Sequence, residues 1–76
     1  MDASFRTGRA DLWIETIFAA QAVARGGVVR RAVRWVESEI GRDRFVAEVR
    51  RRGFHLIECG PQFIVICHQS GLRVIC

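Results

Sequence analysis

The side chains of this sequence that are best suited to chemistry are two histidines and three cysteines. An imidazole can serve as a general base, but neither His55 nor His68 stands in a serine or aspartate motif. Cys59, Cys67 and Cys76 form no CxxC pair. There is also no phosphate loop, nucleotide-binding fingerprint or paired-carboxylate arrangement. We therefore expect a protein that is not an enzyme, with no catalytic residue, no metal site and no cofactor.

The cysteines and the apolar runs also bear on the compartment. An odd number of cysteines without an export signal indicates reduced thiols in a cytoplasm. We expect small buried thiols, with Cys59 as the most plausible reactive exception. The longest apolar run, Leu12–Ala24, contains Glu15, Thr16 and Gln21, and it is too short and too polar to span a bilayer. The sequence therefore predicts no membrane partner.

Arginine supplies every basic side chain. The chain has twelve arginines, no lysine and a net charge of +4. The excess lies just before the C-terminal third, where Arg50, Arg51 and Arg52 precede Gly53. Guanidinium groups grip phosphates and carboxylates, so this cluster suits a partner protein or a nucleic-acid backbone. Three cations followed by glycine are also good chemistry for a helix end, and a GC-rich genome supplies arginine wherever a cation is needed. Both interpretations stay open.

Hydrophobic periodicity predicts three helices before the strands. With 76 residues, of which half are hydrophobic, we expect a single domain over 1–76 with a small core and apolar surface to spare. Apolar residues at three- and four-residue steps predict helices over about 8–25, 28–40 and 43–52. The glycines after the first two helices are good stops. The surplus apolar surface leaves a homodimer open.

The C-terminal third changes to a strand pattern. Runs of β-branched and aromatic residues predict strands over about 54–59, 63–67 and 72–75, with turns at Gly60-Pro61 and Ser70-Gly71. The predicted fold class is α+β, with N-terminal helices packed on a C-terminal three-stranded antiparallel sheet in the order α-α-α-β-β-β.

The turn positions fix which side chains share a face of the predicted sheet. A two-residue loop at the first turn places Glu58 opposite Phe63 and Leu56 opposite Val65. The second turn places Cys67 opposite Val74 and Val65 opposite Cys76. The bulkier face, which we assign to the core, holds Phe54, Leu56, Glu58, Phe63, Val65, Cys67, Leu72, Val74 and Cys76.

The other predicted face has an aliphatic centre and a polar rim, which is how a protein-binding patch looks. Its centre is Ile57, Ile64, Ile66 and Ile75, and its rim is His55, Gln62, His68 and Arg73. A partner or a second copy would cover such a face. The alternative is that a helix wraps onto this side and makes it ordinary core.

Residues 45–76 resemble the HicA-like toxin fold, in which a helix ends in Gly-Phe or Gly-Trp and feeds a strand hairpin. The stretch that carries the resemblance is FVAEVRRRGFHLIECGPQFIVI. The resemblance implies a small RNA-binding module with a sheet like that of double-stranded-RNA-binding domains. The catalytic histidine of that family lies in a Gly-Ser-His-His segment, and the matching stretch here, 60–63, has none. The alternative function that this resemblance implies is therefore an RNA-binding module or a degenerate toxin.

The whole sequence, from MDASFRTGRADLWIE to GLRVIC, is similar to phage-encoded anti-CRISPR proteins, in particular inhibitors of type I-C effector complexes. The resemblance implies a non-enzymatic phage protein in the host bacterial cytoplasm. Such a protein binds a subunit of the CRISPR-Cas surveillance (Cascade) complex and blocks recruitment of target DNA. A further alternative is a small DNA-binding regulator that uses Arg30, Arg31 and Arg34 on one helix.

We therefore expect an inhibitor that acts through protein–protein contact. Nucleic acid remains open as a partner through the arginine cluster. The residues predicted to bind the partner are Arg50, Arg51, Arg52, Arg73, His68, Ile64 and Ile66.

Overall fold

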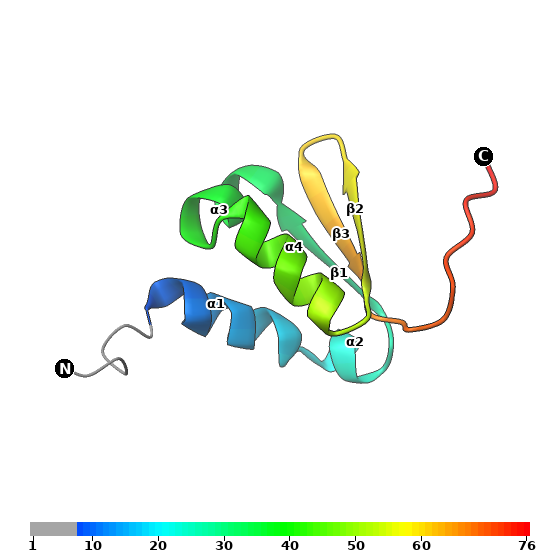
Figure 1. Cartoon of the computed structure of the whole chain (residues 1–76), viewed down its shortest axis with the longest axis horizontal. Helices are drawn as coiled ribbons and strands as arrows, with labels where there is room; N and C mark the ends of the chain where they lie inside the picture. The colour runs from blue at the N-terminus through cyan, green and yellow to red at the C-terminus, as the bar shows by residue number, and fades with distance from the viewer. Residues whose placement is uncertain (1–7) are drawn as a thin grey trace.

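Helices pack on one side of a three-stranded antiparallel sheet, which confirms the predicted α+β class (Figure 1). The computed structural model describes residues 8–76. In chain order the elements are α1 (Arg9–Phe18), α2 (Gln21–Ala24), β1 (Val28–Ala32), α3 (Val33–Glu39), α4 (Arg42–Arg51), β2 (His55–Cys59) and β3 (Gln62–Ile66). The strands lie in the order β1-β3-β2, so β3 is central and both of its neighbours run antiparallel to it.

The hairpin of β2 and β3 has the predicted register. Glu58 lies opposite Phe63 and Leu56 lies opposite Val65, with Gly60-Pro61 as the loop. A two-residue loop allows only one register between the two strands that it joins, so the loop length alone was enough to predict this pairing.

The third strand comes from a different part of the chain than predicted. Residues 28–32 form β1 rather than the first turns of a helix over 28–40, and the helical part is α3. Residues 72–75 form no strand. Val29 lies opposite Val65, the position predicted for Cys76, and the amide of Cys67 donates to the carbonyl of Gly27 at 2.8 Å. The β-branched pair Val28-Val29 suits a strand, and it pairs the second edge of β3.

The first predicted helix, over 8–25, is instead two helices. The chain bends at Ala20, whose backbone is extended (φ −62°, ψ 149°). No glycine or proline lies at the bend, so tertiary packing produces it. Phe18 is buried against the rings of Phe45 and Phe54, and α2 then turns to contact β1. The bend therefore results from packing within the fold and not from the residues at the bend itself.

The core lies between the helices and one face of the sheet. Phe45 and Phe63 are almost fully buried, with ring centroids 5.6 Å apart. The buried residues come from α1, α3, α4, β1 and β3 and from the segments beside them: Ile14, Ile17, Phe18, Val29, Val36, Ile40, Phe45, Val49, Phe63, Val65 and Cys67. At the edge of this core Trp13 and Trp35 pack edge to face with centroids 5.0 Å apart. The large rings thus close the core rather than project into solvent.

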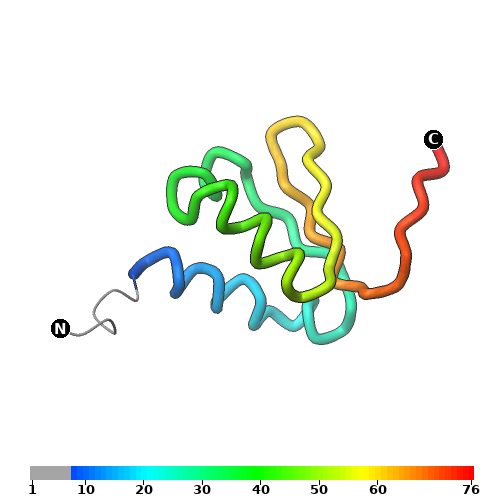
Figure 2. The backbone as a smooth tube through the Cα atoms, in the orientation of Figure 1, coloured from blue at the N-terminus to red at the C-terminus, as the bar shows by residue number. Residues whose placement is uncertain are grey.

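After β3 the chain leaves the sheet. The backbone traced in Figure 2 leads residues 67–76 past the start of β2 and away from the helices. Gln69 Nε2 donates to the carbonyl of Arg52 at 3.1 Å, and His55 Nε2 donates to the carbonyl of Ser70 at 2.7 Å. These contacts hold the segment only as far as the beginning of β2.

Candidate functional site

The face of the sheet that points away from the helices is an apolar surface that the helices of residues 8–76 leave uncovered. We call it the outer face. It is built from three cross-strand rows, which are Val28–Ile66–His55, Arg30–Ile64–Ile57 and Ala32–Gln62–Cys59. Because side chains alternate along a strand, every one of these residues points opposite to the buried Phe63 and Val65.

The outer face has an aliphatic centre within a polar rim. Ile57, Ile64 and Ile66 are partly exposed, and Val28 is 50% exposed. Arg30 and Gln62 are exposed at the margin, and His55 is partly exposed. The core helices pack on the opposite face, and no helix of residues 8–76 covers this one (Figure 1). An apolar centre with a polar rim is the usual anatomy of a protein-binding surface.

The structure places two of the seven predicted partner-binding residues on this face, two in the segment after β3, and the three clustered arginines at the end of α4. Ile64 and Ile66 lie on the central strand, as predicted. His68 and Arg73 lie in the segment after β3 and are exposed there, because residues 72–75 do not form the third strand. Ile75, predicted at the aliphatic centre, is 77% exposed in the same segment.

Two of the three clustered arginines are engaged within the chain. Glu48 accepts a hydrogen bond from Arg51 Nη2 at 2.5 Å and from Arg52 Nε at 2.9 Å. The hydrogen bond from Arg51 is the main cause that lowers the pKa of Glu48 and raises that of Arg51. Arg52 also stacks on the ring of Phe18, with its guanidinium carbon 4.3 Å from the ring centroid. Arg52 therefore closes the end of α4 over the core.

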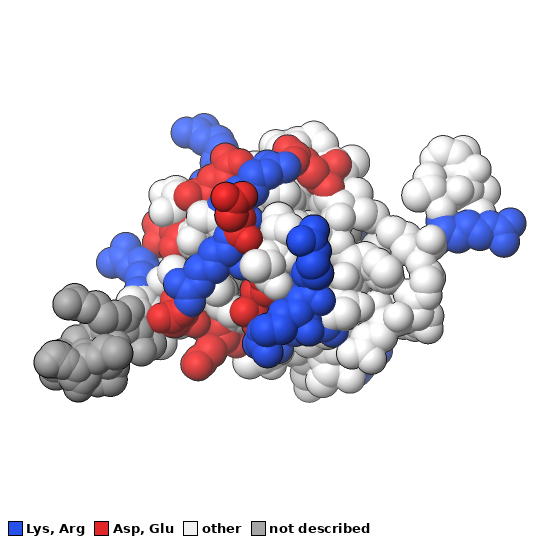
Figure 3. Space-filling model, in the orientation of Figure 1, with Lys and Arg blue, Asp and Glu red and all other residues white. Residues whose placement is uncertain are grey.

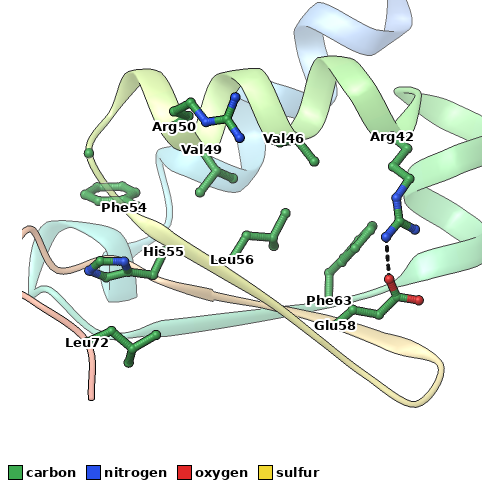
Figure 4. A pocket seen from close by; sticks show the side chains of 11 residues that line it. Arg42, Val46, Val49, Arg50, Phe54, His55, Leu56, Glu58, Phe63 and Leu72 are labelled. Atoms are coloured by element: carbon green, nitrogen blue, oxygen red, sulfur yellow. Dashed lines mark hydrogen bonds and ion pairs between the residues drawn. The ribbon is translucent and has the colours of Figure 1, made fainter. Parts of the chain in front are cut away.

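Arg50 is the member of the cluster that faces a cleft. The cleft, of about 480 Å³, lies between α4 and β2 and has Val46, Val49, Leu56 and Phe63 among its walls (Figure 4). At its other end Arg42 bridges Glu37 at 3.1 Å and Glu58 at 2.5 Å. The hydrogen bonds that Arg42 donates to Glu58, the larger cause, and to Glu37 raise the pKa of Arg42. The bridge explains how a carboxylate is accommodated on the helix side of the sheet.

The arginines of α4 therefore do not form a purely basic patch. Arg44 pairs with Asp11, and Arg9 pairs with Glu39 at 3.6 Å. In the view of Figure 3, which looks onto the helices, blue and red side chains are interspersed. On the face seen in Figure 3, this mixture of charges leaves no extended positive field for a nucleic-acid backbone to follow.

The sequence reasoning missed Arg30 and Val28 as members of the outer face. It also grouped Arg30, Arg31 and Arg34 on one helix, but the first two lie in β1, where consecutive side chains point to opposite faces, and the third lies in α3. The signal that pointed to a strand was the β-branched pair after Gly26-Gly27.

The histidines and cysteines are spread over the molecule. Within residues 8–76 no group of three or more His, Cys, Asp or Glu side chains is placed to hold a metal ion. Cys59 and Cys76 are exposed and Cys67 is buried, and burial raises the pKa of the Cys67 thiol. The hydrogen bond of His55 to the Ser70 carbonyl positions the chain after β3.

Two further findings bear on the class of the protein. None of the helices in the described part of the chain combines the length and the apolar character that a membrane span requires. The sequence matches no protein-family model and no curated protein, and no solved structure matches the fold.

Proposed function

We propose that this protein is a non-enzymatic phage inhibitor that binds a CRISPR-Cas surveillance complex through its outer face and blocks recruitment of target DNA. The observation that carries the binding mode is the uncovered aliphatic centre of that face, at Val28, Ile57, Ile64 and Ile66. The resemblance of the whole sequence to type I-C inhibitors supports the choice of target.

The composition of the outer face suits a protein partner better than a nucleic acid. Burial of partly exposed isoleucines on a partner gains about 25 cal/mol for each Å² of apolar surface removed from water. A sheet that binds single-stranded nucleic acid presents aromatic rings on which bases stack. The outer face has isoleucines at those positions, with the imidazole of His55 at one corner.

Arg30 is the cation that the outer face offers to a partner. It lies directly opposite Ile64 in the sheet and forms no ion pair within residues 8–76. A guanidinium at the margin of an apolar patch steers association with an acidic surface. Arg50, which forms no ion pair within the described residues, lines the cleft on the helix side of the molecule.

The test is recruitment of target DNA by a purified type I-C surveillance complex. Wild-type protein should abolish the shifted DNA band at a stoichiometric ratio. Ile64→Lys, which places a charge at the centre of the outer face, should restore DNA binding. Leu12→Lys is the matched control, because Leu12 is 57% exposed on α1, away from the outer face. Full inhibition by Ile64→Lys, with its fold confirmed by circular dichroism, would remove the outer face from the proposal.

The RNA-binding alternative is separated by a salt series. A nucleic-acid binder loses affinity steeply between low and physiological salt, because each phosphate contact releases a counterion. We expect no stable complex of this protein with RNA or duplex DNA at physiological salt. A tight, steeply salt-dependent complex that Arg50→Glu with Arg51→Glu abolishes would favour the RNA-binding module instead.

A further inference from the structure

The segment after Gly71 exposes apolar side chains without a cover. Leu72 is 45% exposed, and Val74 and Ile75 are each 77% exposed. These three are among only five large hydrophobic residues that are exposed in the described part of the chain. The run Leu-Arg-Val-Ile has the composition of a strand, yet it pairs with no strand in the described part of its own chain, residues 8–76 (Figure 1). The segment therefore has the side chains of a strand without a neighbouring strand to pair with.

The free edge of β2 has backbone N–H and C=O groups with which such a segment can pair. The amide of Val33 donates to Pro61 and that of Cys67 to Gly27, so odd-numbered residues of β3 bond towards β1. Even-numbered residues of β3 therefore bond towards β2, which leaves the N–H and C=O groups of Leu56 and Glu58 directed outwards. An unpaired row of this kind is a template for a further strand.

The cleft beside this edge has room for the side chains of an added strand. It runs along β2 beneath α4, with apolar walls at Val46, Val49 and Leu56 (Figure 4). Leu72 lines its end near His55, so an aliphatic side chain of the same segment already lies there. From that point the chain turns away from β2 instead of following it (Figures 1 and 2).

We propose that residues 72–76 of one copy add as a strand to the free edge of β2 in a second copy, in a reciprocal exchange that forms a homodimer. β2 has five residues, as does the segment, so the lengths match. Ser70-Gly71 provides the point at which the chain leaves its own domain. The exchange provides hydrogen-bond partners for the outward N–H and C=O groups of β2, and it also covers the exposed apolar side chains of the segment.

Charge decides which side of the added strand faces the cleft. Alternate residues point to opposite sides, so either Leu72 and Val74 or Arg73 and Ile75 enter it. Arg50 and Arg42 lie at the two ends of the cleft, and a third guanidinium between them is disfavoured. Leu72 and Val74 therefore face the cleft, and Ile75 extends the aliphatic surface of the outer face beside Ile57.

The experiment measures the mass of the full chain in solution by analytical ultracentrifugation over a wide concentration range. Reducing conditions are kept throughout, because Cys59 and Cys76 are exposed and a disulfide would mimic the dimer. The wild type should reach twice the monomer mass. Val74→Lys, at a position that contributes nothing to its own core, should remain a monomer at every concentration.

A pair of variants at one position tests the edge itself. Glu58→Pro removes the outward N–H that the added strand needs, and proline is tolerated where the N–H faces away from the sheet. Glu58→Ala loses the same ion pair with Arg42 but keeps the N–H. We expect Glu58→Pro to be monomeric and Glu58→Ala to dimerise, with equal circular dichroism spectra.

Three results would overturn the exchange. One is a wild type that stays monomeric over the whole concentration range. Another is a dimer that survives both Val74→Lys and Glu58→Pro. The third is a monomer whose Leu56 and Glu58 amides are protected from hydrogen exchange, which would mean that the segment folds along β2 of its own chain. None of these results bears on the binding of the surveillance complex by the outer face.

Discussion

At the scale of single residues, the arginines divide by what they contact and not by where they stand in the sequence. Arg51 and Arg52 are adjacent to Arg50, yet both bind Glu48 while Arg50 faces the cleft. The sequence identified the cluster but did not predict this division, because the position of Glu48 relative to each guanidinium depends on how α4 ends over Phe18.

The environment of Glu48 predicts a pH dependence of stability. Its pKa is lowered in the folded state, so the folded state binds fewer protons than the unfolded state as the pH falls towards the usual carboxyl range. The stabilisation is complete above the unfolded pKa and is lost as the pH falls through the folded one. Urea unfolding at a series of pH values should show that the free energy of unfolding of Glu48→Gln falls less steeply towards acid pH than that of the wild type. The same steepness in both proteins would mean that Glu48 does not contribute to the loss of stability in acid.

The three thiols should differ in reactivity. Cys59 and Cys76 are exposed, whereas Cys67 is buried with a raised pKa that keeps it as the unreactive thiol. Brief alkylation of the folded protein, followed by mass spectrometry of its peptides, should label Cys59 and Cys76 and leave Cys67 unmodified. Alkylation in denaturant should label all three. Rapid labelling of Cys67 in the folded state would contradict its position in the core.

At the scale of elements, the hairpin was predictable and the third strand was not. The register of this hairpin depends only on the loop at Gly60-Pro61 and the residues next to it, so the sequence was enough to predict Leu56 opposite Val65. The choice between residues 28–32 and residues 72–75 as the partner of β3 is not local. Both segments have β-branched residues, and the packing of α2 and α3 beside β1 decides between them.

The backbone at the junction of α3 and α4 requires a glycine at position 41. Gly41 has φ +101° and ψ 135°, a backbone conformation that an L side chain adopts only at a cost of about 1–3 kcal/mol, although its Cβ would meet no neighbour. Gly41→Ala should therefore destabilise the protein in urea unfolding. Gly71→Ala is the matched control, since Gly71 lies in open space without a positive φ and the change restricts the unfolded chain equally. Equal stability of the two variants would contradict the assigned backbone.

At the scale of the whole molecule, a small core supports a surface that the described residues do not cover. The helices occupy one face of the sheet, and residues 8–76 leave both the outer face and the segment after Gly71 uncovered. The sequence predicted an aliphatic face correctly at Ile57, Ile64 and Ile66 and placed Ile75 there wrongly, because that placement assumed a strand over 72–75.

The small core predicts a large response to a single truncation. Phe45 is fully buried and contacts the rings of Phe18 and Phe63. Phe45→Ala should cost about 3–5 kcal/mol, which is most of the stability of a domain of this size. We expect near-complete loss of cooperative thermal unfolding. Leu12→Ala, at an exposed position, should unfold like the wild type, and a cooperative transition in Phe45→Ala would contradict the described core.

The central claim is that the outer face binds a surveillance complex, and calorimetric titration of that complex tests it most directly. Wild type and Leu12→Lys should bind with the same affinity and a fixed stoichiometry. Ile64→Lys should weaken binding by at least about tenfold, because about 1.4 kcal/mol of lost apolar burial at the centre of the face corresponds to that factor. Equal affinity of Ile64→Lys and the wild type, or no heat of binding for the wild type, would contradict the account.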